Sequence, residues 1–169
     1  MEGSRGYLKV MTSSCAHPHE RIGLKGRTLK AELKAAESRC ADAEQRLTPP
    51  RRRVLELLLE AGQPVKAYDL IAAFGPGGAP AKPPTVYRAL DFLERQGFAH
   101  RIESLNAYVA CQQGPDAHAA AFLICDCCGA TREVEPPGTD RLGELADESG
   151  YRLTMVTIEA HGLCGACVA

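Results

Sequence analysis

Two Cys-x-x-Cys pairs constrain the fold of this chain more than any other feature of its sequence. Cys125 and Cys128 form the first pair, and Cys164 and Cys167 form the second. Each pair presents two thiolates from one tight turn, and two such pairs complete a tetrahedron around Zn²⁺ with no position left for water. The sequence therefore predicts a closed zinc site that stabilises the fold.

The first pair is ambiguous, because Cys127 stands between its two presumed ligands. We prefer Cys128, since the Gly129 that follows it eases the turn that lets backbone amides face the sulfur. The role of Cys127 stays open. A redox disulfide switch in place of zinc is the alternative interpretation of the two pairs.

A second, mixed set of metal-capable side chains lies close by in the sequence. Its members are His100, Cys111, His118 and Glu133. One thiolate and two imidazoles make this set softer than the His/carboxylate sets that suit Fe²⁺, which favours zinc. The four residues would join the two halves of the chain described below, and a sensor needs a metal site that favours one interdomain arrangement.

The length of 169 residues fits one ordinary domain or two small ones. Small domains bury little apolar surface, so a bound structural metal is expected to stabilise them. No apolar run approaches the roughly 20 residues of a membrane span. The first twenty residues lack the apolar region of a secretory signal. We therefore expect a cytoplasmic protein with no membrane partner, in which the eight cysteines are metal ligands and thiols.

The net charge of −1 conceals an uneven distribution. Residues 1–111 hold 17 Lys/Arg against 12 Asp/Glu, which gives +5, while residues 112–169 hold 3 against 9, which gives −6. A basic first half followed by an acidic second half is typical of a nucleic-acid module joined to an assembly module.

Residues 27–111 are predicted to form a winged helix-turn-helix domain. The apolar spacing predicts helices over 28–46, 48–60, 67–74 and 84–96, and strands over 98–103 and 107–111. Helices followed at once by a hairpin are the mark of this DNA-binding fold. We expect residues 1–26 to be a flexible segment, in which 1–10 form a leader or tag and Met11 is the natural start.

Residues 112–118 are predicted to be a hinge, and residues 119–169 a small α/β dimerisation and zinc-binding domain. The patterns predict strands over 119–125, 131–135 and 151–160, and a helix over 140–149. The exposed strand edges predict a homodimer. The whole chain is therefore expected to be an α+β protein.

With these motifs placed, the chain resembles the ferric uptake regulator family, and within it the branch of zinc uptake regulators. The resemblance covers roughly residues 28–169 and is carried by AKPPTVYRALDFL (81–93), QGFAH (96–100), ICDCCG (124–129) and EAHGLCGAC (159–167). It implies a dimeric, metal-dependent DNA-binding repressor that controls zinc uptake genes. It also implies two Zn²⁺ per chain: a structural ion on the four cysteines, and a regulatory ion on His100, Cys111, His118 and Glu133.

The predicted DNA contacts lie in the helical half. Arg88 can donate a fork of hydrogen bonds to guanine, and the resemblance points to Tyr68 against a thymine methyl. Thr85 and Tyr87 lie beside Arg88, off the apolar face of their helix. The candidate phosphate contacts, which position a protein without specifying sequence, are Lys66, Lys82, Arg51, Arg52 and Arg53.

Several other functions remain as alternatives. A zinc enzyme is disfavoured, because the chain lacks the deaminase signature and a His-Glu-x-x-His helix, so we expect no catalytic residues and no small-molecule substrate. A thiol redox sensor could use Cys40, Cys111 or Cys127. An iron, manganese or nickel regulator of the same family also remains, as do further metal ligands at His161 or at Cys15, His17 and His19.

Overall fold

The computed structural model describes residues 23–112, 119–136, 138–154 and 156–168. The predicted flexible segment, the hinge after Gln112, and the candidates Cys15, His17, His19 and His118 therefore fall largely or wholly outside the described residues. In the described parts, no helix is long and apolar enough to cross a membrane.

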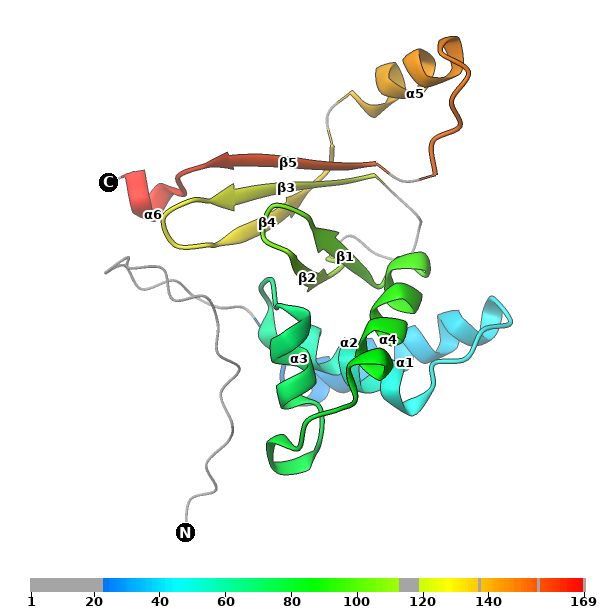
Figure 1. Ribbon diagram of the computed structural model, residues 1–169, viewed down its shortest axis with the longest axis vertical. Coiled ribbons are helices and arrows are strands. Elements are labelled where there is room, and N and C mark those ends of the chain that lie inside the picture. The colour runs from blue at the N-terminus through cyan, green and yellow to red at the C-terminus, as the bar shows by residue number, and fades with distance from the viewer. Residues whose placement is uncertain (1–22, 113–118, 137, 155, 169) are drawn as a thin grey trace.

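The first half of the fold is helical and ends in a hairpin (Figure 1). Its elements are α1 (Gly26–Asp42), α2 (Pro49–Ala61), α3 (Ala67–Ala73), the 3₁₀ turn η1 (Pro76–Gly78), α4 (Pro83–Arg95), β1 (Ala99–Ile102) and β2 (Ala107–Ala110). The apolar residues of α4, from Val86 to Leu93, are buried in the core that the helices share. Gly97 takes φ +68° just after α4, which turns the chain directly into the antiparallel wing hairpin β1–β2.

The second half is built on a three-stranded sheet. Its elements are β3 (Ala120–Cys125), β4 (Thr131–Val134), α5 (Thr139–Glu148), β5 (Thr157–Gly162) and α6 (Gly165–Val168). The strand order is β4-β3-β5, with β3 antiparallel to β4 and parallel to β5. The connection from β4 to β5 carries α5, which projects away from the sheet (Figure 1).

The wing packs on one face of this sheet. Ile102 and Val109 of the hairpin share an apolar cluster with Ala120, Phe122 and Ile124, which alternate along β3. Alternate residues of a strand point to one face, so this face of β3 is the one that meets the wing. The wing thus belongs to both halves: it closes the helical core on one side and covers the sheet on the other.

The α+β expectation is confirmed, and most predicted elements match the observed bounds within one residue at each end. The strand predicted over 151–160 is wrong at both ends, since β5 spans Thr157–Gly162, the residues that pair with Ala120 to Cys125 of β3. The helix predicted over 28–46 ends early, at Asp42, because Glu44 takes a left-handed φ of +54°. The short α6 and η1 were not expected.

Candidate metal centres and nucleic-acid interface

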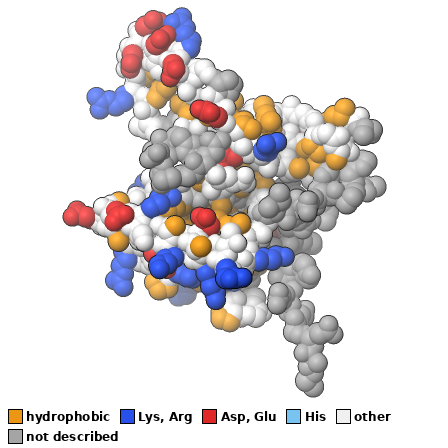
Figure 2. Space-filling view, turned by 180° about the vertical axis from the view of Figure 1, so that it is seen from behind, with side chains coloured by type: hydrophobic (Ala, Val, Ile, Leu, Met, Phe, Trp, Pro, Cys, Tyr) orange, Lys and Arg blue, Asp and Glu red, His pale blue; other side chains and the backbone are white. Residues whose placement is uncertain are grey.

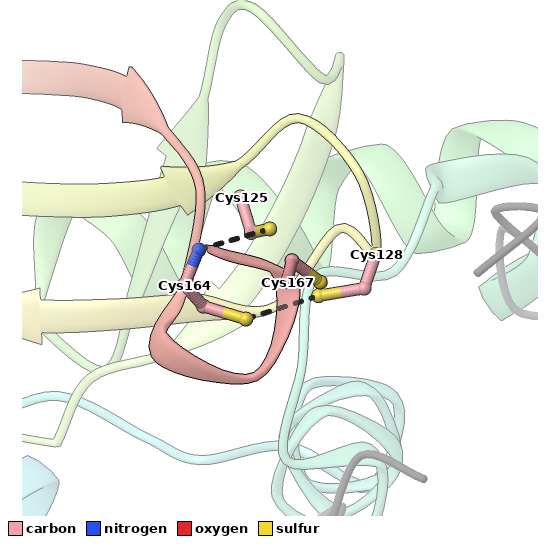
Figure 3. Close-up of side chains that lie close together, drawn as sticks. All are labelled: Cys125, Cys128, Cys164 and Cys167. Atoms are coloured by element: carbon pink, nitrogen blue, oxygen red, sulfur yellow. Dashed lines mark hydrogen bonds between the residues drawn. The ribbon is translucent and has the colours of Figure 1, made fainter. Parts of the chain in front are cut away.

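The four cysteines of the two Cys-x-x-Cys pairs lie together at one end of the sheet (Figure 3). Their sulfur atoms all lie within 4.8 Å of one another, and the Sγ atoms of Cys128 and Cys164 are 3.7 Å apart. A zinc tetrahedron with Zn–S bonds of about 2.3 Å has edges of about 3.8 Å, so the donor set fits that ion. In the described part of the chain, this group consists of Cys125, Cys128, Cys164 and Cys167, and Cys127 is not one of its members.

Parallel pairing of β3 with β5 brings the two pairs together. Cys125 ends β3 opposite Gly162, and the Asp126 amide donates to the Gly162 carbonyl at 2.8 Å. Gly129 takes φ +72° and closes the first turn, in which its amide donates to the Cys125 carbonyl. The second pair begins just after β5 and continues into α6, so both turns lie at the same end of the sheet.

Backbone amides already prepare this cluster for negative charge. The Cys164 amide donates to the Cys125 sulfur at 3.3 Å, and the Ala130 amide donates to the Cys128 sulfur at 3.4 Å. Hydrogen bonds from the backbone of Cys128 and Cys164 lower the pKa of Cys125 to about 6. Burial and hydrogen bonding with the neighbouring thiols raise the pKa of Cys167 to about 12. Four crowded thiols cannot all ionise without a cation, which is why such a cluster suits a dication.

A second donor set joins the wing to the sheet. His100 on β1, Cys111 just after β2 and Glu133 on β4 have ligand atoms within 4.8 Å of one another. His100 Nε2 lies 3.3 Å from Glu133 Oε1, and Cys111 Sγ lies 3.8 Å from the same oxygen. Zn–N and Zn–O bonds of about 2.0–2.1 Å give an N···O edge of about 3.3–3.4 Å, so this set also fits zinc.

Glu133 is the one charged residue classed as buried in the described part of the chain, and its side chain is 1% exposed. Its second oxygen accepts a hydrogen bond from the Gln112 amide at 2.8 Å. Burial disfavours a charged His100, but hydrogen bonds with Cys111 and Glu133 outweigh that effect and raise its pKa to about 9. A carboxylate is expensive to bury without a cationic partner, so the site is built for positive charge.

His118, the fourth predicted ligand of this set, lies outside the described residues, so its place in the set stays a prediction. His161 contacts Asp126 instead of either donor set, with its Nδ1 2.9 Å from Asp126 Oδ1. That contact makes it a neighbour of the first Cys-x-x-Cys turn.

The predicted base-reading residues lie on the surface of α3 and α4. Tyr68 is 77% exposed and Tyr87 48%, and Arg88 is exposed while Thr85 is partly covered. Lys66 and Lys82 are exposed at the N-caps of α3 and α4. Figure 2 shows Lys and Arg side chains gathered along the edge formed by the helical half, and acidic side chains gathered on α5 at the far end.

The three consecutive arginines of α2 each have a partner within the chain. Arg51 donates to the Arg46 carbonyl at 2.7 Å and stacks over the Phe92 ring. Arg52 pairs with Glu37 at 2.8 Å. Arg53 donates to the carbonyls of Ala73 and Phe74 and pairs with Glu56. Their use as phosphate contacts stays a prediction, but Arg53 has a structural task that the sequence did not indicate.

Comparison with known proteins identifies the family. A model described as "Ferric uptake regulator family" matches residues 42–161. The chain belongs to this family. Among its relatives, the zinc uptake regulation protein of Escherichia coli (strain K12) is 47% identical over 143 residues, covering 83% of this chain and 84% of that protein. The ferric uptake regulation protein of Synechococcus elongatus is 27% identical, covering 83% and 92%.

Two solved structures are similar to this chain in both sequence and fold. A zinc uptake regulator complexed with zinc and DNA superposes with a TM-score of 0.77 and 46% identity, covering 85% of this chain and 97% of that chain. A crystal structure of holo XcZur gives a TM-score of 0.72 and 42% identity, covering 82% of this chain and 97% of that chain. The family is one of transcription regulators.

Proposed function

We propose that this chain is a zinc-responsive, sequence-specific DNA-binding repressor of zinc uptake genes, acting as a cytoplasmic homodimer with two zinc ions per chain. The support comes from relatives at 46–47% identity that are named for zinc uptake regulation, one of them solved with zinc and DNA. The fit of two separate donor sets to zinc supports the count of two. We propose that the protein is not an enzyme and has no small-molecule substrate.

The observation that carries the proposal is the position of the mixed donor set. His100 and Cys111 belong to the wing, and Glu133 belongs to the sheet. These side chains meet only when the wing is closed on the sheet, so metal binding here stabilises the closed arrangement. If operator DNA prefers the same arrangement, metal and DNA strengthen each other's binding by the same factor.

Each residue of the mixed donor set has a different role. Glu133 supplies the buried negative charge, held in place by the Gln112 amide. Cys111 supplies a thiolate, the soft donor that favours zinc over iron and manganese. When bound, the metal neutralises the carboxylate and thiolate charge. His100 would have to release a proton before it could hold the metal, since its raised pKa of about 9 favours the protonated ring at neutral pH.

DNA binding is assigned to the exposed side of α3 and α4. Arg88 lies in the first half of α4, where a recognition helix reaches base edges, and Tyr68 projects from α3. Lys66 and Lys82 would contact phosphates beside them. A homodimer would present two such surfaces to an operator with two-fold symmetry.

The test is a titration of operator affinity with Zn²⁺, Fe²⁺, Mn²⁺ and Ni²⁺ side by side. We expect zinc to raise operator affinity more than the other metals do. The increase over metal-free protein should be roughly 5–150-fold, the range of ordinary allosteric coupling. Cys111→Ala should abolish this response while keeping one zinc per chain on the four cysteines. Cys40→Ala is the matched control, since Cys40 is a buried thiol on α1 outside both donor sets, and it should keep the zinc response.

Three outcomes would contradict the proposal. A stronger response to another metal would make the chain a regulator of that metal. Full zinc stimulation in Cys111→Ala would show that the mixed set is not the sensor. A response to oxidant that persists without any metal would favour a thiol redox sensor.

A further inference from the structure

A row of three side chains crosses the face of the sheet that meets the wing. Phe122 of β3 is paired with Glu133 of β4 and with Glu159 of β5. Paired residues of neighbouring strands point to the same face, so two carboxylates flank one aromatic ring on this face. Glu133 belongs to the mixed donor set, and the ring of Phe122 lies edge-on to His100 with centroids 5.6 Å apart. Glu159, at the other end of the row, has no part in either donor set.

Glu159 binds the turn of the wing. Its Oε1 accepts a hydrogen bond from the Glu103 amide at 2.7 Å, and its Oε2 accepts one from the Ser104 amide at 3.1 Å. The side chain is only 15% exposed. Burial alone would raise its pKa, but hydrogen bonds from Ser104 and Glu103 outweigh burial and hold the pKa of Glu159 below its ordinary value. The carboxylate therefore binds the turn in its charged form.

The wing turn offers amides that its own hairpin does not use. The last pair of the β1–β2 ladder joins Ile102 to Ala107, so the Glu103 and Ser104 amides lie beyond it. Inside the turn, the Asn106 amide donates to the Glu103 carbonyl, and Asn106 takes φ +47°. The Glu103 and Ser104 amides both donate to the Glu159 carboxylate on the sheet. An ionised carboxylate is the strongest kind of acceptor for such amides.

We propose that Glu159 is a positioning residue that clamps the wing turn to the sheet, so that the closed arrangement is held at both ends of one cross-sheet row. This inference rests on the proposed function. The metal set holds the base of the wing through Glu133, and Glu159 holds its tip. Between them lies the apolar contact of Ile102 and Val109 with β3. The clamp fixes the angle of the wing before metal arrives, and so preorganises His100 and Cys111 against Glu133.

The clamp predicts a loss of sensing without a loss of fold. Glu159→Gln keeps the size of the side chain but supplies one oxygen in place of two, so one wing amide loses its acceptor and the charge assistance disappears. We expect affinity for the second zinc, and zinc-stimulated operator affinity, each to fall by roughly tenfold, the value of one hydrogen bond to a charged group. The four-cysteine zinc and the dimer should be unchanged.

Glu135→Gln is the matched control. Glu135 is exposed just after β4, and its replacement removes the same charge from the same sheet. The measurements are a zinc competition titration, operator binding in zinc excess, zinc content and sedimentation. Glu159→Gln affinities indistinguishable from those of Glu135→Gln would overturn the clamp. So would loss of the four-cysteine zinc in Glu159→Gln, because Glu159 would then support the fold of the sheet.

Hydrogen exchange in the unmodified protein gives an independent test. The amides of Glu103 and Ser104 should be protected, more strongly with zinc and operator bound, and Glu159→Gln should remove that protection. Exchange at the rate of an open loop in the zinc-loaded protein would overturn the clamp. Failure of the clamp leaves the Cys111→Ala result intact, whereas failure of the proposed function would remove the zinc response from unmodified protein as well.

Discussion

The guanidinium of Arg53 closes the C-terminal end of α3. It donates to the carbonyls of Ala73 and Phe74, which the helix itself leaves unpaired, and its third contact is the carboxylate of Glu56. Arg53 lies in a run of three arginines that the sequence presents as equivalent phosphate contacts. The structure separates them by their partners, because the direction of each side chain on α2 decides what it can reach.

Arg53→Ala should therefore destabilise the fold, while Arg52→Ala should not. Losing the charged donor leaves two carbonyls without their partner, which costs about 1–2 kcal/mol of unfolding free energy after allowing for partial exposure. Arg52 makes one exposed ion pair with Glu37, so its loss should cost less than about 1 kcal/mol. Denaturant unfolding of the zinc-loaded variants measures both values. Equal stabilities would contradict the division between the two arginines.

At the scale of the element, α4 is the recognition helix of the proposed function. Its apolar residues face the core, and Arg88 lies on the exposed side. Arg88→Ala should weaken operator binding by about 1–3 kcal/mol, the value of a lost bidentate base contact. Lys82→Ala should instead weaken binding to all DNA sequences alike. It should also lower the slope of log affinity against log salt concentration by about one unit. Equal losses on operator and random DNA for both variants would refute this division.

A zinc ion on the four-cysteine cluster, as proposed above, would hold the end of the sheet together. Cys164→Ser removes a ligand from the four-cysteine cluster, and structural zinc can contribute on the order of 10 kcal/mol to folding. We expect this variant to lose its zinc and to unfold or aggregate. Cys127→Ser, which changes a cysteine outside the cluster, should keep the zinc and the fold. Zinc analysis with circular dichroism tests the pair, and a well-folded, zinc-free Cys164→Ser protein would refute the assignment.

Local patterns were enough to predict most elements and the four-cysteine set, whereas the mixed set depended mainly on the family resemblance, and three of its four predicted residues lie together in the described residues. Apolar spacing in α4 and the Cys-x-x-Cys turns are encoded within a few residues of each other, so the sequence reveals them directly. The bounds of β5 and the role of Glu159 depend on which strand pairs with which. Glu159 gave one weak signal: Thr157, Glu159 and His161 are polar at alternate positions, which indicates a face that meets something other than a core.

At the scale of the whole molecule, the described residues of the acidic half leave three leucines exposed, one on the sheet and two on α5. Leu123 on β3 is 50% exposed, and Leu142 and Leu145 on α5 are each 43% exposed. Leu123 alternates with Phe122 and Ile124, so it points to the face opposite the wing. The homodimer of the proposed function would cover these leucines and leave the α3–α4 surfaces free for DNA.

Leu123→Glu should therefore dissociate the dimer, because a charge would be buried without a partner. Sedimentation of the zinc-loaded protein at micromolar concentration should give a dimer for the unmodified chain and a monomer for the variant. Asp147→Asn, on the exposed side of α5 that faces away from Leu142 and Leu145, is the control and should stay dimeric. A monomeric unmodified protein, or a dimeric Leu123→Glu, would exclude this surface as the interface.

The four-cysteine cluster also sets where the chain tolerates a change of length. Cys128 and Cys164 are 36 residues apart, and the segment between them carries β4, α5 and β5. The cluster joins the ends of this loop, and the entropy of closing a loop grows only with the logarithm of its length, by about 0.6 kcal/mol for each doubling. Added residues beside α5, which lies far from α6 and its Cys167 in Figure 1, therefore cost little. One residue inserted between Cys125 and Cys128 would move two sulfur atoms apart and open the tetrahedron.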